Sequence, residues 1–197
     1  MQPLRAALAC LIPLERSAAY TWGSTAAERA RAFPCDGLVP QPTDALFRAV
    51  DVAAPARVVF RWLCQLRAAP YSYDWIDNLG RQSPRRLTPG LERLAVGQRV
   101  MTFFELIAFE PDRHLTLVGR MPGPGAILGR LAASYVIVAR GETNARLVVK
   151  LVVGYPQGPL GWAMRGLLPW ADLAMMRKQL LTLQRLAEAS AAHAGAG

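Results

Sequence analysis

Apolar residues recur at every second position between residues 98 and 155, and this alternation constrains the fold more than any other feature of the chain. A period of two is typical of strands with one buried face. Breaks rich in Pro and Gly mark turns, and they are too short for the crossovers that parallel strands need. The pattern therefore predicts an antiparallel meander with strands at residues 100–109, 114–119, 131–139 and 145–155.

One further strand and several helices flank the meander. Residues 46–52 alternate and predict the first strand, and Pro55 occupies a favoured first-turn position of the helix that follows. A second short helix is expected from a cap at Ser72 or Asp74 to about residue 80. A long amphipathic helix is predicted from Leu160 to Ala192, with Pro169 either kinking it or separating a short segment from it.

This order of elements predicts an α+β fold in which a curved antiparallel sheet is covered by one long C-terminal helix, with two short helices after the first strand. A single helix cannot cover a strongly curved sheet completely. The remaining gap must hold large side chains, water or a ligand. A cavity between helix and sheet is therefore a hypothesis, because many α+β domains close such a gap with side chains.

The chain has 197 residues, of which 52% are hydrophobic, and this suits one domain with one core. We expect residues 1–43 to be an N-terminal extension that packs on the domain, residues 44–192 to form the domain and residues 193–197 to be a disordered tail. The apolar start bears some likeness to a lipoprotein signal around Cys10, but Pro13 interrupts it, which favours a short helix packed on the domain. No uncharged run reaches the ~20 residues of a spanning helix, so no stable membrane insertion is expected.

The net charge is +9, and only Lys150 and Lys178 among the 23 basic residues are lysines. Such an arginine excess can indicate anion binding, or it can reflect coding bias. Residues 80–99 carry five arginines against one glutamate. This basic loop could attract acidic head groups, but no recognition helix or RNP-like motif accompanies it, so nucleic acid is not an expected partner.

Cys10, Cys35 and Cys64 are an odd number of cysteines without paired spacing. A disulfide framework is not expected, although one disulfide bridge is an open alternative. A reducing, cytoplasmic location is favoured. The two histidines lie far apart and there is no Cys-x-x-Cys motif. We therefore predict neither a metal site nor a cofactor.

Several short motifs occur in a fixed order, and Tyr71-Ser72-Tyr73-Asp74-Trp75 is the strongest of them. It follows Ala54-Pro55 and Phe60-Arg61-Trp62-Leu63-Cys64-Gln65-Leu66, and it precedes Phe109-Glu110-Pro111 and Met176-Arg177-Lys178-Gln179-Leu180. Over about residues 44–190 the chain resembles the SRPBCC or START-like superfamily, in particular its polyketide-cyclase/dehydrase-like and lipid-transport branch. The resemblance implies a helix-grip fold with a deep cavity that binds or processes hydrophobic small molecules.

Two function hypotheses follow from the resemblance. The first is binding or transport of a lipid- or polyketide-like molecule in the cavity. The second is a cofactor-independent cyclase or dehydratase, which would need two or more ionisable groups inside that cavity. A regulatory interaction domain is a third hypothesis, and a homodimer is a further possibility.

The densest polar and aromatic cluster follows the first helix. Its tyrosine hydroxyls and its carboxylate could orient a carbonyl-bearing ligand or act as acid and base. Alternatively, the carboxylate caps the short helix and the aromatic rings wedge that helix against the sheet. The cluster consists of Tyr71, Tyr73, Asp74, Trp75 and Asn78.

A second candidate group surrounds Pro169. Met and Trp side chains adapt well to irregular apolar ligands, so this group could form a gate over the cavity. Core packing is the alternative for each of its members. The group consists of Trp162, Met164, Leu168, Trp170 and Met175.

The catalytic candidates are Glu105, His114 and Tyr73. Glu105 interrupts an apolar strand, and burial in a cavity would raise the pKa of its carboxyl group. His114 could be a general base, or it could be a solvated histidine beside a turn. No Ser or Cys nucleophile can be assigned beside it.

Overall fold

The computed structural model describes residues 18–78, 80–119 and 130–194. Four short helices, six strands and one long helix follow one another in it. They are α1 (Ala18–Thr21), α2 (Ala26–Arg29), β1 (Asp44–Val52), α3 (Ala56–Cys64), the 3-10 turn Gln65–Arg67, α4 (Asp74–Asp77), β2 (Arg99–Val100), β3 (Phe104–Glu110), β4 (His114–Gly119), β5 (Arg130–Ala139), β6 (Ala145–Gly154) and α5 (Pro159–Ala194).

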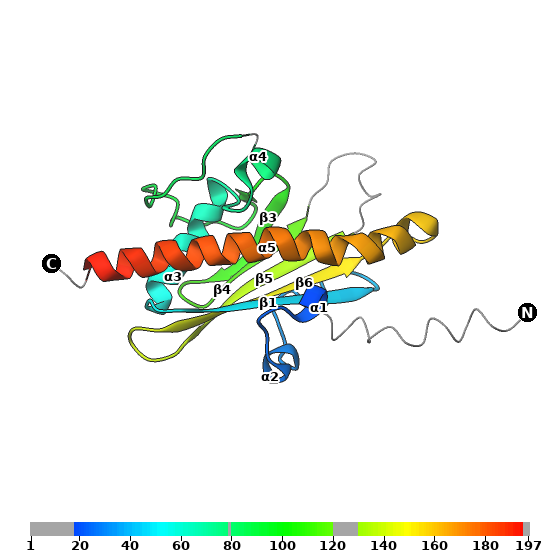
Figure 1. The fold of residues 1–197 in the computed structure, drawn as a ribbon, viewed down its shortest axis with the longest axis horizontal. Helices are drawn as coiled ribbons and strands as arrows, with labels where there is room; N and C mark the ends of the chain where they lie inside the picture. Colours follow the sequence, from blue (N-terminus) through cyan, green and yellow to red (C-terminus); the bar gives the residue numbers. More distant parts are fainter. Residues whose placement is uncertain (1–17, 79, 120–129, 195–197) are drawn as a thin grey trace, which may run out of the picture.

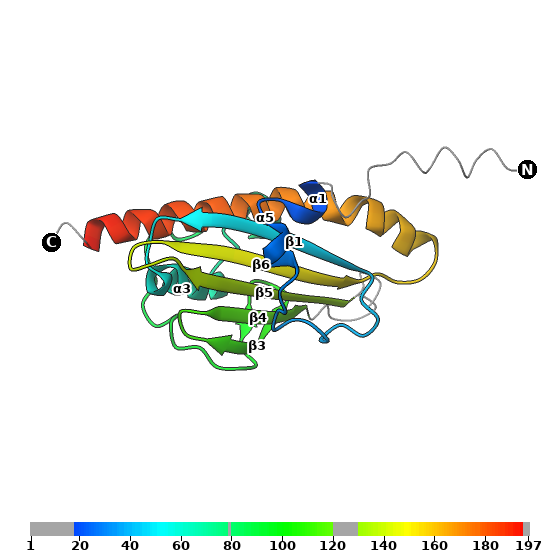
Figure 2. The ribbon, with the colours of Figure 1, turned by 90° about the horizontal axis from the view of Figure 1, so that it is seen from below.

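The strands form one sheet in the order β1-β6-β5-β4-β3-β2, and every neighbouring pair is antiparallel. Helix α5 crosses one face of this sheet (Figures 1 and 2). The predicted meander and the predicted helix-grip α+β fold are confirmed. One predicted strand is divided, because Met101 has a φ of 52° and the chain turns there, so that β2 folds back on β3. The pairing sets Arg99 opposite Glu105.

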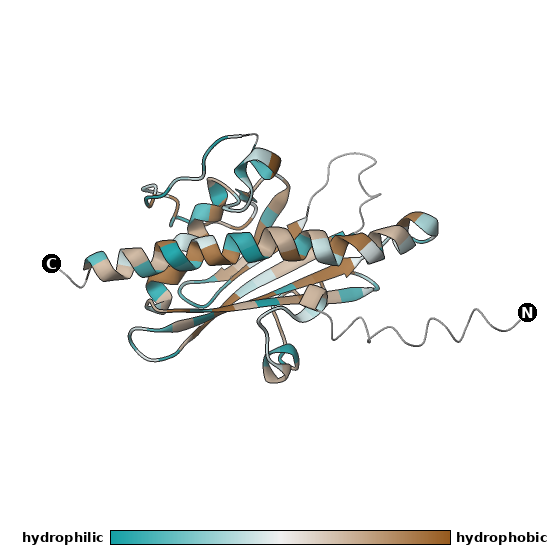
Figure 3. Cartoon of the chain, viewed as in Figure 1, coloured by the Kyte–Doolittle hydropathy of each residue, from teal (hydrophilic) through white to brown (hydrophobic). Residues whose placement is uncertain are grey.

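The main core lies between the sheet, α3 and α5. Its buried side chains include Trp62 and Leu63 from α3, Leu147 from β6, and Leu180 and Leu183 from α5. The hydrophobic stretches of β5 and β6 lie beneath α5 (Figure 3). Burial of these apolar side chains holds the long helix against the sheet.

The other face of the sheet is covered by the segment that leads into β1. Phe33, Cys35 and Val39 pack there against Phe47 and Val148. Arg146 and Lys150 alternate with Val148 and Val152 along β6, a pattern that by itself predicts a solvated face, but Arg146 is buried. The N-terminal segment covers that face and supplies its own carboxylates to the two cations.

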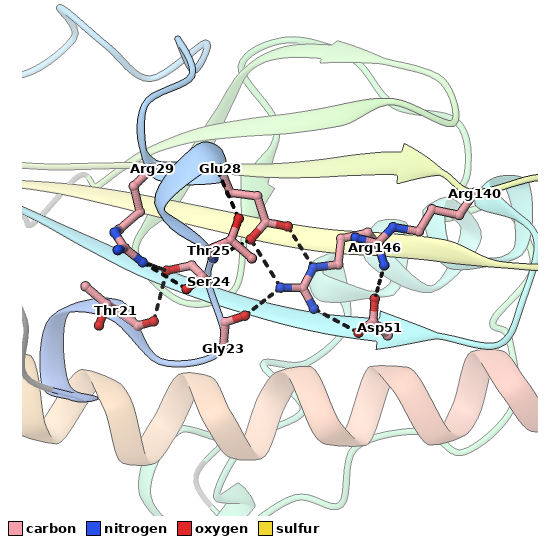
Figure 4. A network of polar contacts seen from close by, with 9 residues as sticks. All are labelled: Thr21, Gly23, Ser24, Thr25, Glu28, Arg29, Asp51, Arg140 and Arg146. Carbon is pink, nitrogen blue, oxygen red and sulfur yellow. Dashed lines mark hydrogen bonds and ion pairs between the residues drawn. The ribbon is translucent and has the colours of Figure 1, made fainter.

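Arg146 fixes this segment to the sheet (Figure 4). Its guanidinium donates to Glu28 at 2.8 and 3.1 Å, to Asp51 at 3.1 Å and to the carbonyl of Gly23. A side chain at position 23 would lie 2.0 Å from the carbonyl oxygen of Ala49, and φ is +74°, so the close approach requires glycine. Thr25 and Glu28 form a capping box that starts α2.

The structure corrects the expected cap of α4 and decides between the two alternatives at Pro169. Neither Ser72 nor Asp74 caps α4, whose N-cap residue is Tyr73 without a side-chain bond; Asp74 instead accepts hydrogen bonds from Ser83. Pro169 does not separate a segment from α5, which is continuous and curves in its first turns (Figure 2). The buried guanidinium of Arg48 donates to the carbonyl of Pro169 at 3.2 Å and holds this turn against the sheet.

Candidate functional site

A pocket of about 230 Å³ lies between the first half of α5 and the sheet, and we call it the helix–sheet pocket. Strands β5 and β6 form its floor and α5 forms one wall. The chain before α4 and the turn between β2 and β3 form the rest. Its lining residues are Pro70, Ser72, Asp77, Met101, Thr102, Phe103, Phe104, Leu131, Ala133, Tyr135, Val149, Leu151, Leu168, Ala171, Asp172, Met175, Met176 and Gln179.

Tyr135 and Gln179 are the most deeply buried polar residues of the lining. The phenol of Tyr135 donates to Oε1 of Gln179 at 2.7 Å, and Nε2 of Gln179 donates to the carbonyl of Pro70 at 2.6 Å. Burial raises the pKa of Tyr135 above its usual value, so the phenol keeps its proton. These bonds connect α5 to β5 and to the segment before α4. Tyr135 and Gln179 therefore already serve as hydrogen-bond partners for each other.

Asp172 brings a carboxyl group from α5 to the pocket wall, where it meets Arg48 from β1. Nη2 of Arg48 lies 2.7 Å from Oδ2 of Asp172, and the arginine side chain is only 1% exposed. Arg48 also donates to the carbonyls of Phe47 at 2.8 Å and of Ala19 at 2.7 Å. Burial raises the pKa of Asp172 to about 6, although the guanidinium acts in the opposite direction. The carboxyl group therefore changes charge near neutral pH.

Asp77, the last residue of α4, places a second carboxyl group at the pocket. The hydroxyl of Ser72 donates to its Oδ2, while its Oδ1 is buried without a hydrogen-bond partner. Burial raises the pKa of Asp77 above its usual value. A buried acceptor without a partner favours a ligand that offers a hydrogen-bond donor there.

Of the residues that the sequence nominated, Leu168 and Met175 line this pocket. Tyr71 is buried beside Trp62, with ring centroids 6.1 Å apart, and its hydroxyl has no partner. Three nominated tryptophans point outward: Trp75 on α4 is 75% exposed, and Trp162 and Trp170 on α5 are 82% and 56% exposed. The structure therefore does not bring the two nominated groups together.

The other nominated residues lie outside the pocket lining. Tyr73, Asp74, Asn78 and Met164 are partly exposed around α4 and early α5. The two nominated strand residues, Glu105 and His114, are partly exposed as well; His114 borders a separate polar groove of about 470 Å³, which also contains Arg31 and Asp112. Within the described ranges, no three potential metal ligands come together.

Sequence reasoning missed Arg48, Tyr135, Asp172 and Gln179. A signal was present for three of these residues. Arg48 shares a strand face with Leu46 and Val50, which are both buried. An arginine within an apolar strand face is therefore the signal for a buried cation. Asp172 and Gln179 are seven positions apart and therefore lie on one face of the helix, the face that meets the sheet.

Three solved structures illustrate the likeness of this chain to known proteins. The Zhui aromatase/cyclase from Streptomyces sp. R1128 is 15% identical, with 73% of this chain and 93% of that chain covered and a TM-score of 0.49. Protein MLL2253 from Mesorhizobium loti is 13% identical, with 72% and 95% covered and a TM-score of 0.47. A point mutant of norcoclaurine synthase from Thalictrum flavum is 15% identical, with 73% and 93% covered and a TM-score of 0.42.

No family model matches the chain, and no curated protein matches it. The sheet order and the position of α5 give the chain the helix-grip fold that its sequence resemblance implied. Among the described helices, none is both long enough and apolar enough to cross a bilayer.

Proposed function

We propose that this chain binds a small apolar molecule in the helix–sheet pocket. The observation that carries the proposal is the pocket itself, about 230 Å³ of space lined mostly by Leu, Val, Met, Phe and Ala side chains. Apolar pockets with a few placed polar groups are the usual sites of small-molecule binding.

The volume sets the size of the ligand. An apolar cavity of about 150 Å³ holds one benzene ring, so this pocket has room for a molecule of about two rings. A complete diacyl lipid or a four-ring polyketide would need more space than the pocket offers. Within the lipid- or polyketide-like class that the sequence suggested, the pocket favours a compact one- or two-ring member.

The polar groups set the chemistry of the ligand. Oδ1 of Asp77 lacks a partner, whereas Tyr135 and Gln179 are bonded to each other. We therefore expect a ligand with one hydroxyl or amine group that donates to Asp77, and with an apolar remainder that contacts Leu151 and Met175.

Titration with 2-naphthol, followed by its fluorescence and by native mass spectrometry, tests the proposal. The wild-type chain should bind one molecule, and Ala133→Leu should weaken binding at least about tenfold because the added side chain fills the pocket. Ala189→Leu is the matched control, since Ala189 is an exposed residue far along α5. The proposal fails if 2-naphthol does not bind, or if Ala133→Leu and Ala189→Leu bind it equally.

A cofactor-independent enzyme is the second candidate, and the carboxyl group of Asp172 favours it. A group with a pKa near 6 at the wall of an apolar pocket suits general acid–base catalysis. Turnover of a ring ketone should then follow a pH profile with an inflection near 6, and Asp172→Asn should remove that inflection while 2-naphthol still binds. A profile without this inflection would exclude Asp172 from the chemistry.

A further inference from the structure

The outward side of the first half of α5 is apolar, and no residue that the structure describes covers it. It presents two tryptophans and a leucine, with exposed fractions of 82%, 72% and 56% at Trp162, Leu167 and Trp170. Exposed small residues fill the surface between them. We call this surface the outer apolar face, and it consists of Trp162, Ala163, Gly166, Leu167, Trp170 and Ala174.

Packing among the described residues does not account for this face. The opposite side of the same turns provides the pocket residues Leu168 and Met175, and Arg48 holds Pro169 and Asp172 from below. In Figure 1 this part of α5 lies in front of the sheet, with no described element over it. Contiguous apolar surface of this kind marks an interaction site.

The charges around the outer apolar face are positive. The exposed Arg177 and Lys178 follow it directly, whereas the half-exposed Arg165 is paired with Asp44 of β1. Asp172 is the one acidic residue among residues 159–176, and it faces Arg48 instead of solvent. The whole chain carries +9.

We propose that the outer apolar face docks on the surface of a membrane that contains anionic lipid. Tryptophan side chains favour the boundary between water and lipid, and cations beside an apolar helical face are drawn to anionic head groups. Docking is peripheral, with α5 lying in the plane of the interface. The pocket-lining side of the helix stays inside the protein, so this inference does not depend on what the pocket binds.

Charge argues against a second copy of the chain as the occupant. Two copies that met through this face would bring two sets of cations together, Arg177 and Lys178 from each, in proteins that each carry +9. Like charges that face each other across an interface are unfavourable. An anionic surface instead gains from the same cations.

Flotation of the full chain with vesicles tests the proposal. Wild type should float with vesicles of equal parts phosphatidylglycerol and phosphatidylcholine, less with phosphatidylcholine alone, and less at high salt. Trp162→Ser/Trp170→Ser should weaken partitioning by about tenfold or more. Trp75→Ser is the matched control, because it removes a similarly exposed tryptophan from α4 and should leave partitioning unchanged.

Three results would overturn the proposal. The first is absence of wild-type binding to the anionic vesicles, and the second is equal binding by wild type and Trp162→Ser/Trp170→Ser. The third is a wild-type dimer, seen by light scattering, that the double variant lacks, since a second copy would then cover the face. Both tryptophans are largely exposed, so unchanged urea unfolding of the double variant is expected and shows that its fold is intact.

Discussion

Arg48 and Asp172 join the edge strand of the sheet to the C-terminal helix, with Nη2 and Oδ2 2.7 Å apart. The same guanidinium donates to the carbonyls of Ala19 and Pro169. One side chain from β1 therefore holds α1 and the proline-containing turn of α5 together. Because Asp172 also lines the helix–sheet pocket, the ion pair that holds α5 to the sheet also affects the charge at the pocket wall.

Removing Arg48 alone should be costly. Arg48→Met removes the donor to Asp172 and to the buried carbonyls of Ala19 and Pro169, and we expect a loss of about 3–5 kcal/mol in the free energy of unfolding. Arg48→Met/Asp172→Leu should be more stable than Arg48→Met, because it removes both charges. Urea unfolding gives the free energy of unfolding of wild type, of Arg48→Met and of the double variant. Arg140→Ala is the control. It breaks an exposed ion pair with Asp51 and should change the free energy of unfolding by at most about 1 kcal/mol. A wild-type value for Arg48→Met would contradict this account.

The pH dependence of stability should reveal the raised pKa of Asp172. The pKa is about 6 in the folded chain, above the ordinary value near 4 in the unfolded chain, so the folded state binds this proton more tightly. The tighter binding of this proton therefore stabilises the folded state fully below pH 4, and this stabilisation is lost as the pH rises through 6. The unfolding free energy of wild type minus that of Asp172→Asn should therefore fall by about 2–3 kcal/mol between pH 4 and 7. A difference that rises over this range would show that the attraction of Arg48 outweighs burial.

Glu28 should show the opposite pH dependence. Hydrogen bonds from Arg146 lower the pKa of Glu28 to about 2 in the folded chain. Its stabilisation is therefore full above about pH 4.5 and is lost as the pH falls towards 2. Glu28→Gln should lower the unfolding free energy by about 1–2 kcal/mol at pH 7, and the difference should vanish in acid. Glu142→Gln, on an exposed turn, serves as the control. An effect of Glu28→Gln that persists at pH 2 would refute the ion-pair explanation.

Cys35 and Cys64 should resist alkylation in the native chain. Both are fully buried free thiols, and burial raises the pKa of Cys64 to about 12 and that of Cys35 above its usual value. The thiolate is the reactive form, so native labelling should be slow and should become fast in urea. Iodoacetamide labelling followed by peptide mass spectrometry measures both rates. Equal rates in buffer and in urea would mean that the two thiols are accessible in the folded protein.

The sequence alone determined most of the framework. Alternation placed β1, β4, β5 and β6 to within two residues, because one buried face imposes a period of two on an antiparallel strand. It missed the division at Met101, because a positive φ in a residue other than glycine leaves no mark on the hydrophobic pattern. It also included Leu168 and Met175 in the group around Pro169 that could contact a ligand, and both line the pocket.

Only the tertiary structure decided which distant side chains meet. Arg48 and Asp172 are 124 positions apart, and Tyr135 and Gln179 are 44 apart. Periodicity shows which side of an element faces inward, but the register between α5 and the sheet decides which inward residues come into contact. For the same reason the sequence could not distinguish Trp162 and Trp170, which face outward, from their neighbours that line the pocket.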